Sequence, residues 1–265
     1  MSTNTSTRTF APNPGAAPLP RMIGAQTALE TRMLLRNGEQ LLLTVIIPSL
    51  LLLLFSTVDV VTVPTQNAGG RGKSVDFLAP GILALAVMST AFTGQAIATG
   101  FERRYGVLKR LGASPLPRWA LMTAKTGSVL VTEILQIALL TVIALALGWS
   151  PHGNLLSVLL LLVLGTAAFS GLGLLMAGTL KAEATLAAAN LVFLLLLVGG
   201  GVIVPLDKFP HGLRSALELL PITALSDGLR DVLQYGRDMP WGEAGILAVW
   251  AVLGLGAAAR WFRWE

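Results

Sequence analysis

Residues 67–74 read NAGGRGKS and come close to the loop with which many nucleotide-binding proteins hold phosphates. That loop, G-x-x-x-x-G-K-[ST], uses its lysine to reach the phosphates and its hydroxyl to reach Mg²⁺. Gly72, Lys73 and Ser74 satisfy the end of the pattern, but Asn67 stands where its first glycine belongs. The motif also requires a strand before it and a soluble helix after it, so its meaning depends on the surrounding elements.

A second group of chemically notable residues is polar and lies within an otherwise apolar run. Glu133 is the one acidic residue deep in such a run, with Gln136 one turn further on and Lys125 two turns back. A carboxylate within a membrane costs about 3 kcal/mol unless it is protonated, paired or hydrated. Glu133 is therefore a candidate for binding a cationic drug or relaying a proton. The alternative is a structural hydrogen bond between helices, with Lys125 reaching up from the interface.

Other kinds of site find little support in the sequence. There is no cysteine, which excludes disulfides and thiolate metal sites. His152 and His211 are isolated from each other and from any acidic cluster, so neither a metal site nor an intramembrane enzyme is expected.

The elements that position these residues are membrane helices. The chain is 54% hydrophobic and only 12% charged, half of the roughly 25% charged residues of soluble domains. A membrane-spanning helix needs roughly 20 mostly apolar residues. Six runs meet that need, at about 41–58, 77–99, 120–148, 154–180, 184–205 and 241–259. We therefore predict an all-α integral membrane protein with six transmembrane helices.

The distribution of basic residues predicts the orientation of these spans. With both termini in the cytoplasm, 13 of the 19 Lys and Arg residues lie on the inner side and 6 on the outer side, as the positive-inside rule requires. This bias also accounts for the net charge of +5 without a nucleic-acid partner. Residues 67–74 then lie outside the cell, where ATP is scarce, so we interpret them as a flexible glycine-rich turn. The chain itself is not expected to hydrolyse ATP.

The segments outside the spans differ in character. Residues 1–20 are rich in Ser, Thr, Pro and Ala and are predicted to be a disordered tail. Residues 21–38 place apolar side chains on one face and are predicted to form a helix along the inner interface. Residues 206–238 are predicted to form an outer segment of two short helices broken at Pro221. The transmembrane domain is thus expected to cover residues 21–265.

The loop between the second and third predicted spans, FERRYGVLKRLGASPLPRW (101–119), is expected to contain a short, basic helix ended by two prolines. It could simply anchor the inner surface to lipid headgroups, or it could dock a partner protein. Residues 101–111, followed by Ala-Ser-Pro-Leu at 113–116, resemble the ERE-x-G-T-L-x-x-L-x-x-T-P stretch of ABC-2 type permeases. They are most similar to the daunorubicin-resistance (DrrB-like) branch of drug exporters.

The resemblance extends over nearly the whole chain after residue 20. The segment VPLDKFPHGLRSALELLPITALSDGLRDVL (204–233) resembles the P-x-x-x-L-P…L-x-P-L-T-x-x-x-x-x-x-R stretch of the same family. The chain departs from the family pattern at Arg104, where a second acidic residue is common, and at Val107, where threonine is common. The resemblance implies the ABC-2 (type V) exporter fold.

The resemblance also implies partners. Two permease chains, most simply two copies of this one, would form the pathway, and two separate ATPase chains would bind ATP and Mg²⁺ and dock from the cytoplasm. The loop at 101–115 would be the coupling helix that receives their motion. Its candidate docking residues are Glu102, Arg103, Arg104, Tyr105, Gly106, Leu108, Lys109, Arg110 and Leu111.

The second and fifth spans, by the same resemblance, would surround the central pathway. An aromatic side chain beside amide groups suits a flat, amphipathic ligand, although phenylalanines in membrane helices also simply pack. The candidate pathway residues are Phe92, Thr93, Gln95, Glu133, Gln136, Asn190 and Phe193. Gly199, Gly200 and Gly201 would form an outer gate or a sharp turn, or a close helix contact.

These observations predict the permease subunit of an ATP-driven ABC exporter in a bacterial inner membrane, carrying a hydrophobic, drug-like or lipidic compound outward. Export of a polysaccharide or lipid-linked glycan is the alternative cargo assignment. An ion-coupled carrier is a further alternative because of Glu133, but such carriers usually show paired broken helices in repeated halves, and no convincing internal repeat is present.

Overall fold

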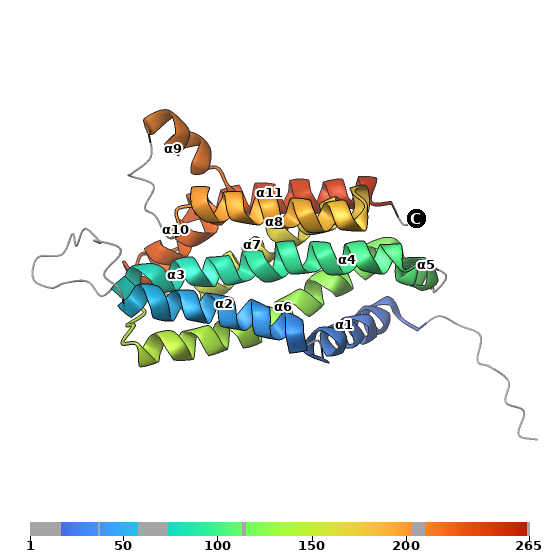
Figure 1. Ribbon diagram of the computed structural model, residues 1–265, viewed down its shortest axis with the longest axis horizontal. Coiled ribbons are helices and arrows are strands. Elements are labelled where there is room, and N and C mark those ends of the chain that lie inside the picture. The colour runs from blue at the N-terminus through green and yellow to red at the C-terminus, as the bar shows by residue number, and fades with distance from the viewer. Residues whose placement is uncertain (1–16, 37, 58–73, 113–114, 203–209, 264–265) are drawn as a thin grey trace, which may run out of the picture.

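The computed structural model describes residues 17–36, 38–57, 74–112, 115–202 and 210–263, and all its regular elements there are helical. The helices run back and forth along one long axis (Figure 1). In chain order they are α1 (Leu19–Arg36), α2 (Gly38–Thr57), α3 (Ser74–Val87), the π-helical segment η1 (Met88–Gly94), α4 (Gln95–Arg104), α5 (Val107–Gly112), α6 (Arg118–Ala146), α7 (Leu155–Thr179), α8 (Ala182–Gly199), α9 (His211–Leu217), α10 (Pro221–Leu233) and α11 (Trp241–Trp261).

Five of the described helical rods are long and apolar enough to cross a membrane: α3 through η1 to α4, α6, α7, α8 and α11. The prediction of an all-α membrane protein is thus confirmed. The predicted first span, 41–58, lies on α2, whose described side chains include the shorter apolar stretch Thr44–Leu54. The number of six spans therefore stays a prediction. One end of the bundle carries α1, α5 and the end of α11, and the other carries α9 and α10 (Figure 1); we call them the α5 end and the α10 end.

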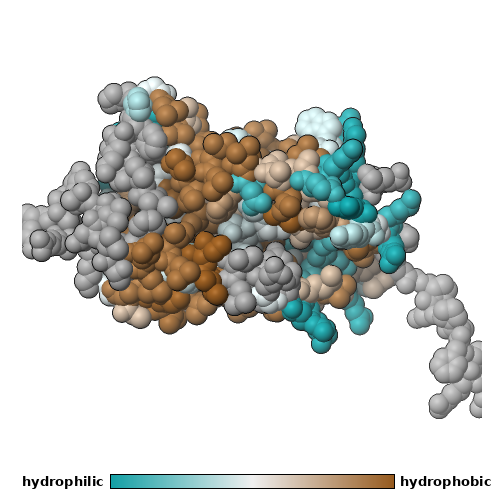
Figure 2. Space-filling model, in the orientation of Figure 1, coloured by the Kyte–Doolittle hydropathy of each residue, from teal (hydrophilic) through white to brown (hydrophobic). Residues whose placement is uncertain are grey.

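The surface of the bundle has the character expected of a protein in lipid. Large apolar side chains point outward, for example Leu195 on α8 and Val252 on α11, which are 63% and 72% exposed. Lipid tails are as apolar as leucine, so this exposure carries no penalty in a membrane. Figure 2 shows an apolar surface over much of the visible face and a gathering of hydrophilic residues at the α5 end.

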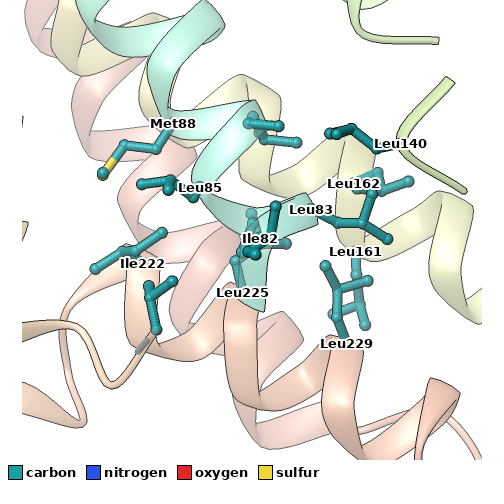
Figure 3. Packing of buried hydrophobic residues seen from close by; sticks show 14 of the residues in the cluster. Ile82, Leu83, Leu85, Met88, Leu140, Leu161, Leu162, Ile222, Leu225 and Leu229 are labelled. Carbon is teal, nitrogen blue, oxygen red and sulfur yellow. The ribbon is translucent and has the colours of Figure 1, made fainter. Parts of the chain in front are cut away.

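The core is built around α3, whose side chains are almost completely buried. Ile82 and Leu85 of α3 and Met88 of η1 belong to one buried cluster with Ile222 and Leu225 of α10 and Leu161 of α7 (Figure 3). In α10, the fully buried Ile222 and Leu225 are spaced to face the bundle together, so this helix closes one end of the core. The sequence predicts two short helices broken at Pro221 in this segment, and in its described part α9 ends at Leu217 and α10 begins at Pro221.

Helix α1 packs on α6 through a polar face, and its apolar side chains point away from the bundle. Glu30 and Thr31 are buried against the bundle, whereas Leu29 and Met33 are about half exposed, at 51% and 55%. In a membrane, that arrangement directs polar groups toward protein and apolar groups toward lipid.

Several predictions from the sequence fall outside the described residues. Of the phosphate-loop-like stretch 67–74, only Ser74 is described, as the first residue of α3. Most of the predicted tail, 1–20, and the start of the predicted outer segment also lie outside this part of the chain.

Candidate functional site

The turn between α4 and α5 forms a protruding element at the α5 end. Gly106 has a φ of 70°, a left-handed conformation that glycine adopts readily, and this allows the chain to turn sharply into α5. Leu108 is fully buried and anchors α5 to the bundle, while Tyr105, Lys109 and Arg110 are exposed. The ring of Tyr105 stacks on Phe101, with 6.1 Å between ring centroids. The element therefore presents one aromatic ring and two cations outward from a fixed base.

The two arginines before this turn bind the connection between α7 and α8. The guanidinium of Arg103 donates to the carbonyl of Gly178 at 2.6 Å and to the carbonyl of Leu180. These carbonyls lie at the C-terminal end of α7, where a cation is stabilised by the helix dipole. Arg104 pairs with Glu183 in the first turn of α8. The α4–α5 turn is thus fastened to α7 and α8.

Glu102 belongs to a buried ionic cluster that joins three helices. The ammonium group of Lys125 on α6 lies 2.5 Å from Oε2 of Glu102 on α4, and 3.1 Å from Oε1 of Glu30 on α1. Gln26 donates a further hydrogen bond to Glu30 at 2.9 Å. Buried ion pairs of this kind fix geometry more than they add stability, and losing one partner is costly. The cluster therefore links α1 to α4, the helix that leads into α5.

The predicted docking residues accordingly separate into two groups. Glu102, Arg103 and Arg104 make contacts within the chain, and Leu108 is buried. Those available to a partner are Tyr105, Lys109 and Arg110. Sequence reasoning overlooked Glu30 and placed Lys125 with Glu133. The available signal for Glu30 was that it is the one acidic residue within 21–38.

Glu133 lies in the interior, between α6 and α7. Its Oε2 accepts a hydrogen bond of 2.5 Å from the hydroxyl of Thr166, and its Oε1 has no partner among the described residues. The side chain is 2% exposed. Lys125 does not pair with it, so the suggested contact between these two residues is wrong.

Gln136 ties α6 to two other helices. Its Oε1 accepts a hydrogen bond of 2.8 Å from Thr90 in η1, and its Nε2 donates to the carbonyl of Thr44 in α2. Glu133 and Gln136 thus serve different interfaces and do not converge on one cavity.

The remaining predicted pathway residues occupy different surroundings. Phe92 is buried in η1, while Thr93 is half-buried and its hydroxyl has no partner among the described residues. Asn190 is exposed on α8 and donates to the carbonyl of Leu186, and Phe193 packs against the edge of the core. A π-helical segment inside a span often marks a functional site, because it re-aims side chains and leaves backbone groups unpaired.

The glycine run 199–201 at the end of α8 contacts α10. Gly200 lies so close to Ile222 that a Cβ atom would stand 2.4 Å from its side chain, and Gly201 has a φ of 65°. Arg230 of α10 donates to the carbonyls of Gly201 and Val202, both at 2.9 Å. The run is therefore a sharp turn that is clamped by α10.

No group of His, Asp and Glu that could hold a metal ion occurs in the described part of the chain. The polar groups join helices, and several of them line a cavity between α1, η1, α4 and α6 near the α5 end.

Comparison with known proteins identifies relatives of the chain as a whole. A family model described as ABC-2 family transporter protein matches residues 22–260. The Bacillus subtilis (strain 168) protein YvfS, named as a transport permease, is 25% identical over 231 residues, which cover 86% of this chain and 91% of YvfS. ABC transporter G family member 20 of Dictyostelium discoideum is 26% identical over 187 residues, 69% of this chain. The matched region is only 25% of that larger protein.

Proposed function

The chain belongs to the ABC-2 family of transporter proteins, and from this premise we propose that it is the permease subunit of an exporter powered by separate ATPase chains. Family membership and the apolar helices together make it a multi-pass membrane permease of an ABC transporter. Such a transporter needs an ATPase. We assign ATP and Mg²⁺ binding to that partner, in two copies.

The observation that carries the proposal is the construction of the α4–α5 turn. Its outer surface offers Tyr105, Lys109 and Arg110, while Leu108 and the contacts of Arg103 fix the turn to the bundle. An element that passes motion from an ATPase to the bundle must be held rigidly on its inner side and must offer a binding surface on its outer side. The α4–α5 turn meets both requirements. The Glu102–Lys125–Glu30 cluster extends the rigid connection to α1.

A second permease chain, most simply a copy of this one, would complete the pathway. The surface of α8 supports this, because the polar Asn190 is exposed there among the apolar Leu191, Leu194 and Val198, and a polar group facing lipid is unfavourable. The η1 segment and α8 would then border a pathway for a drug-like or lipidic compound, as expected for a DrrB-like exporter. An exporter of a polysaccharide or lipid-linked glycan is the alternative, since the few polar groups in these helices would also fit a membrane-anchored glycan.

We place the protein in a bacterial inner membrane with both termini in the cytoplasm. This orientation puts the α5 end on the side where ATP is present. The hydrophilic character of that end in Figure 2 supports the same assignment.

Charge reversal on the outer surface of α5 tests the docking proposal. Lys109→Glu combined with Arg110→Glu is expected to abolish co-purification with the cognate ATPase and transport into liposomes, because both cations are exposed and would face an acidic surface. Glu102→Lys is a poor test, since it would break the buried cluster with Lys125.

The matched control is Arg237→Glu, a charge reversal of an exposed cation at the α10 end. That variant should retain ATPase binding and transport. If the α5 double variant binds the ATPase as tightly as the unaltered chain does, the docking assignment is wrong.

A further inference from the structure

A cavity lies between α1, η1, α4 and α6, near the α5 end of the bundle. Its lining residues come from all four of these elements. Leu34 and Val129 contribute apolar walls, and Glu30, Glu102, Lys125 and Gln95 contribute polar ones. The cavity thus borders the ionic cluster described above, and it lies apart from Glu133.

The charges around this cavity do not balance. Two carboxylates, of Glu30 and Glu102, share the single ammonium group of Lys125. The nearby Arg103 and Arg104 are turned toward the α7–α8 connection instead. One formal negative charge is therefore left over. Such a charge is unfavourable where water is scarce, unless a further cation or proton joins it.

Gln95 provides an independent sign that a group is missing. Its side chain is 6% exposed, and neither the oxygen nor the nitrogen of its amide has a hydrogen-bond partner among the described residues. Buried amides are nearly always satisfied, because an unpaired one costs about 1–3 kcal/mol. Gln95 lines the same cavity as the two carboxylates, so one cationic donor can serve both the excess carboxylate charge and the unpaired amide oxygen.

We propose that this cavity binds the primary ammonium group of an amphiphile. The single excess charge suits a monovalent cation, and the N–H groups of an ammonium can donate both to a carboxylate and to the oxygen of Gln95. The alkyl part would lie against Leu34 and Val129. Two sources share this chemistry: the headgroup of an amine lipid in the surrounding leaflet, and an amine-bearing cargo. Only the second source rests on the proposed export function.

Binding is measured on the purified full-length permease in nanodiscs of phosphatidylglycerol, without the ATPase. The six tryptophans report thermal unfolding. n-Octylammonium chloride is expected to raise Tm in a saturable manner, because a ligand that binds only the folded state stabilises it. The uncharged n-octanol, with the same chain length, is expected to give no such rise. Equal shifts with both compounds, or no shift with either, overturn the proposal.

Two variants address the two deficits separately. Gln95→Leu removes the unpaired amide while it leaves the ion pairs intact, so the ligand-free protein should keep or raise its Tm. Glu30→Gln removes the excess charge. Each is expected to weaken n-octylammonium binding about tenfold or more, since each removes one polar partner of a cation.

Gln234→Leu is the matched control, because the amide oxygen of Gln234 at the α10 end likewise has no hydrogen-bond partner in the described part of the chain. It should bind n-octylammonium as the unaltered chain does. If Gln95→Leu folds and still binds n-octylammonium with unaltered affinity, the proposal is contradicted, even if Glu30→Gln fails to fold.

Nanodisc composition distinguishes the two sources. If phosphatidylethanolamine raises Tm by itself and abolishes the n-octylammonium shift, while phosphatidylcholine does neither, the ligand is a lipid headgroup. If the n-octylammonium shift persists in phosphatidylethanolamine, the site selects an amine-bearing cargo. Either result supports the site. Because the ATPase is absent, failure here is separate from failure of the docking proposal.

Discussion

Three polar residues of α6 show how side chains within a membrane bundle join helices. Lys125 contacts α1 and α4, Glu133 contacts α7, and Gln136 contacts η1 and α2. Their spacing places them on the buried side of α6, while residues such as Ile134 and Val142 face outward. Because hydrophobic association is weak between helices in lipid, hydrogen bonds of this kind help to select which helix faces meet.

Glu133 and Thr166 form the simplest test of this role. Thr166→Val removes the hydroxyl that donates to Glu133 and is expected to destabilise the protein by about 1–3 kcal/mol, because it leaves a buried polar group unpaired. Glu133→Gln retains an acceptor for Thr166 and should be neutral or stabilising. Thermal unfolding of both variants, with transport measured in parallel, checks this. A Glu133→Gln variant of normal stability but without transport would instead show that the carboxylate acts on cargo or protons.

Arg230 is the corresponding residue at the α10 end. Besides the carbonyls of Gly201 and Val202, it contacts Asp227 at 2.8 Å and lies 4.1 Å above the ring of Phe77. Burial lowers the pKa of Arg230, and the nearby carboxylate of Asp227 opposes that shift; the guanidinium keeps its charge because the usual arginine pKa is so high.

Arg230→Met is expected to cost about 3 kcal/mol or more in unfolding free energy, since it leaves buried carbonyls and a carboxylate without their donor. Arg230→Lys should recover only part of this, because one ammonium cannot reach all the acceptors. The control is Arg237→Met, which breaks an exposed pair with Asp231 and should cost less than about 1 kcal/mol. Similar losses at both positions would refute a special role for Arg230.

At the scale of helices, glycine sets the closest approach in the bundle. At Gly171 on α7, an added Cβ would stand 2.5 Å from the backbone nitrogen of Leu255 on α11. No real side chain tolerates that distance, so the two helices would have to separate. Gly256, on α11, has nothing within 4 Å of an added Cβ.

Gly171→Ala is therefore expected to lower the unfolding free energy by about 1–3 kcal/mol through overpacking. Gly256→Ala should cause no loss, and its better helix propensity adds up to about 1 kcal/mol. Denaturation in detergent, followed by tryptophan fluorescence, compares the two. Equal stability of the two variants would mean that α7 and α11 are not held at this distance.

The helices themselves could largely be predicted from the sequence, because uncharged runs of about 20 residues have few alternatives in a membrane. The predicted 241–259 span and α11, for example, differ by two residues at the C-terminal end. The π-helical segment could not be foreseen, since Met88–Gly94 has no sequence signal that separates it from ordinary helix. The same limit applies to the candidate site. Lys125 could pair with a carboxylate on its own helix or on others, and only the packing of α1 and α4 against α6 decides between them.

For the whole molecule, the distribution of charge supports one orientation that can be measured directly. The unaltered chain contains no cysteine, so a single introduced cysteine is the only residue of this chain that a thiol reagent labels. Lys109 at the α5 end and Asp238 beyond α10 are both exposed, and they mark the two ends of the bundle. The proposed topology puts Lys109 in the cytoplasm and Asp238 outside.

A charged maleimide that cannot cross the membrane is therefore expected to label Asp238→Cys in intact cells, and Lys109→Cys only after permeabilisation. The cysteine-free chain provides the background. In permeabilised cells that also produce the ATPase, Lys109→Cys should be protected from labelling, because docking covers α5, while Asp238→Cys should react as before. Labelling of Lys109→Cys in intact cells would mean that the chain has the opposite orientation. It would also place α5 outside the cell, where no cytoplasmic ATPase can reach it.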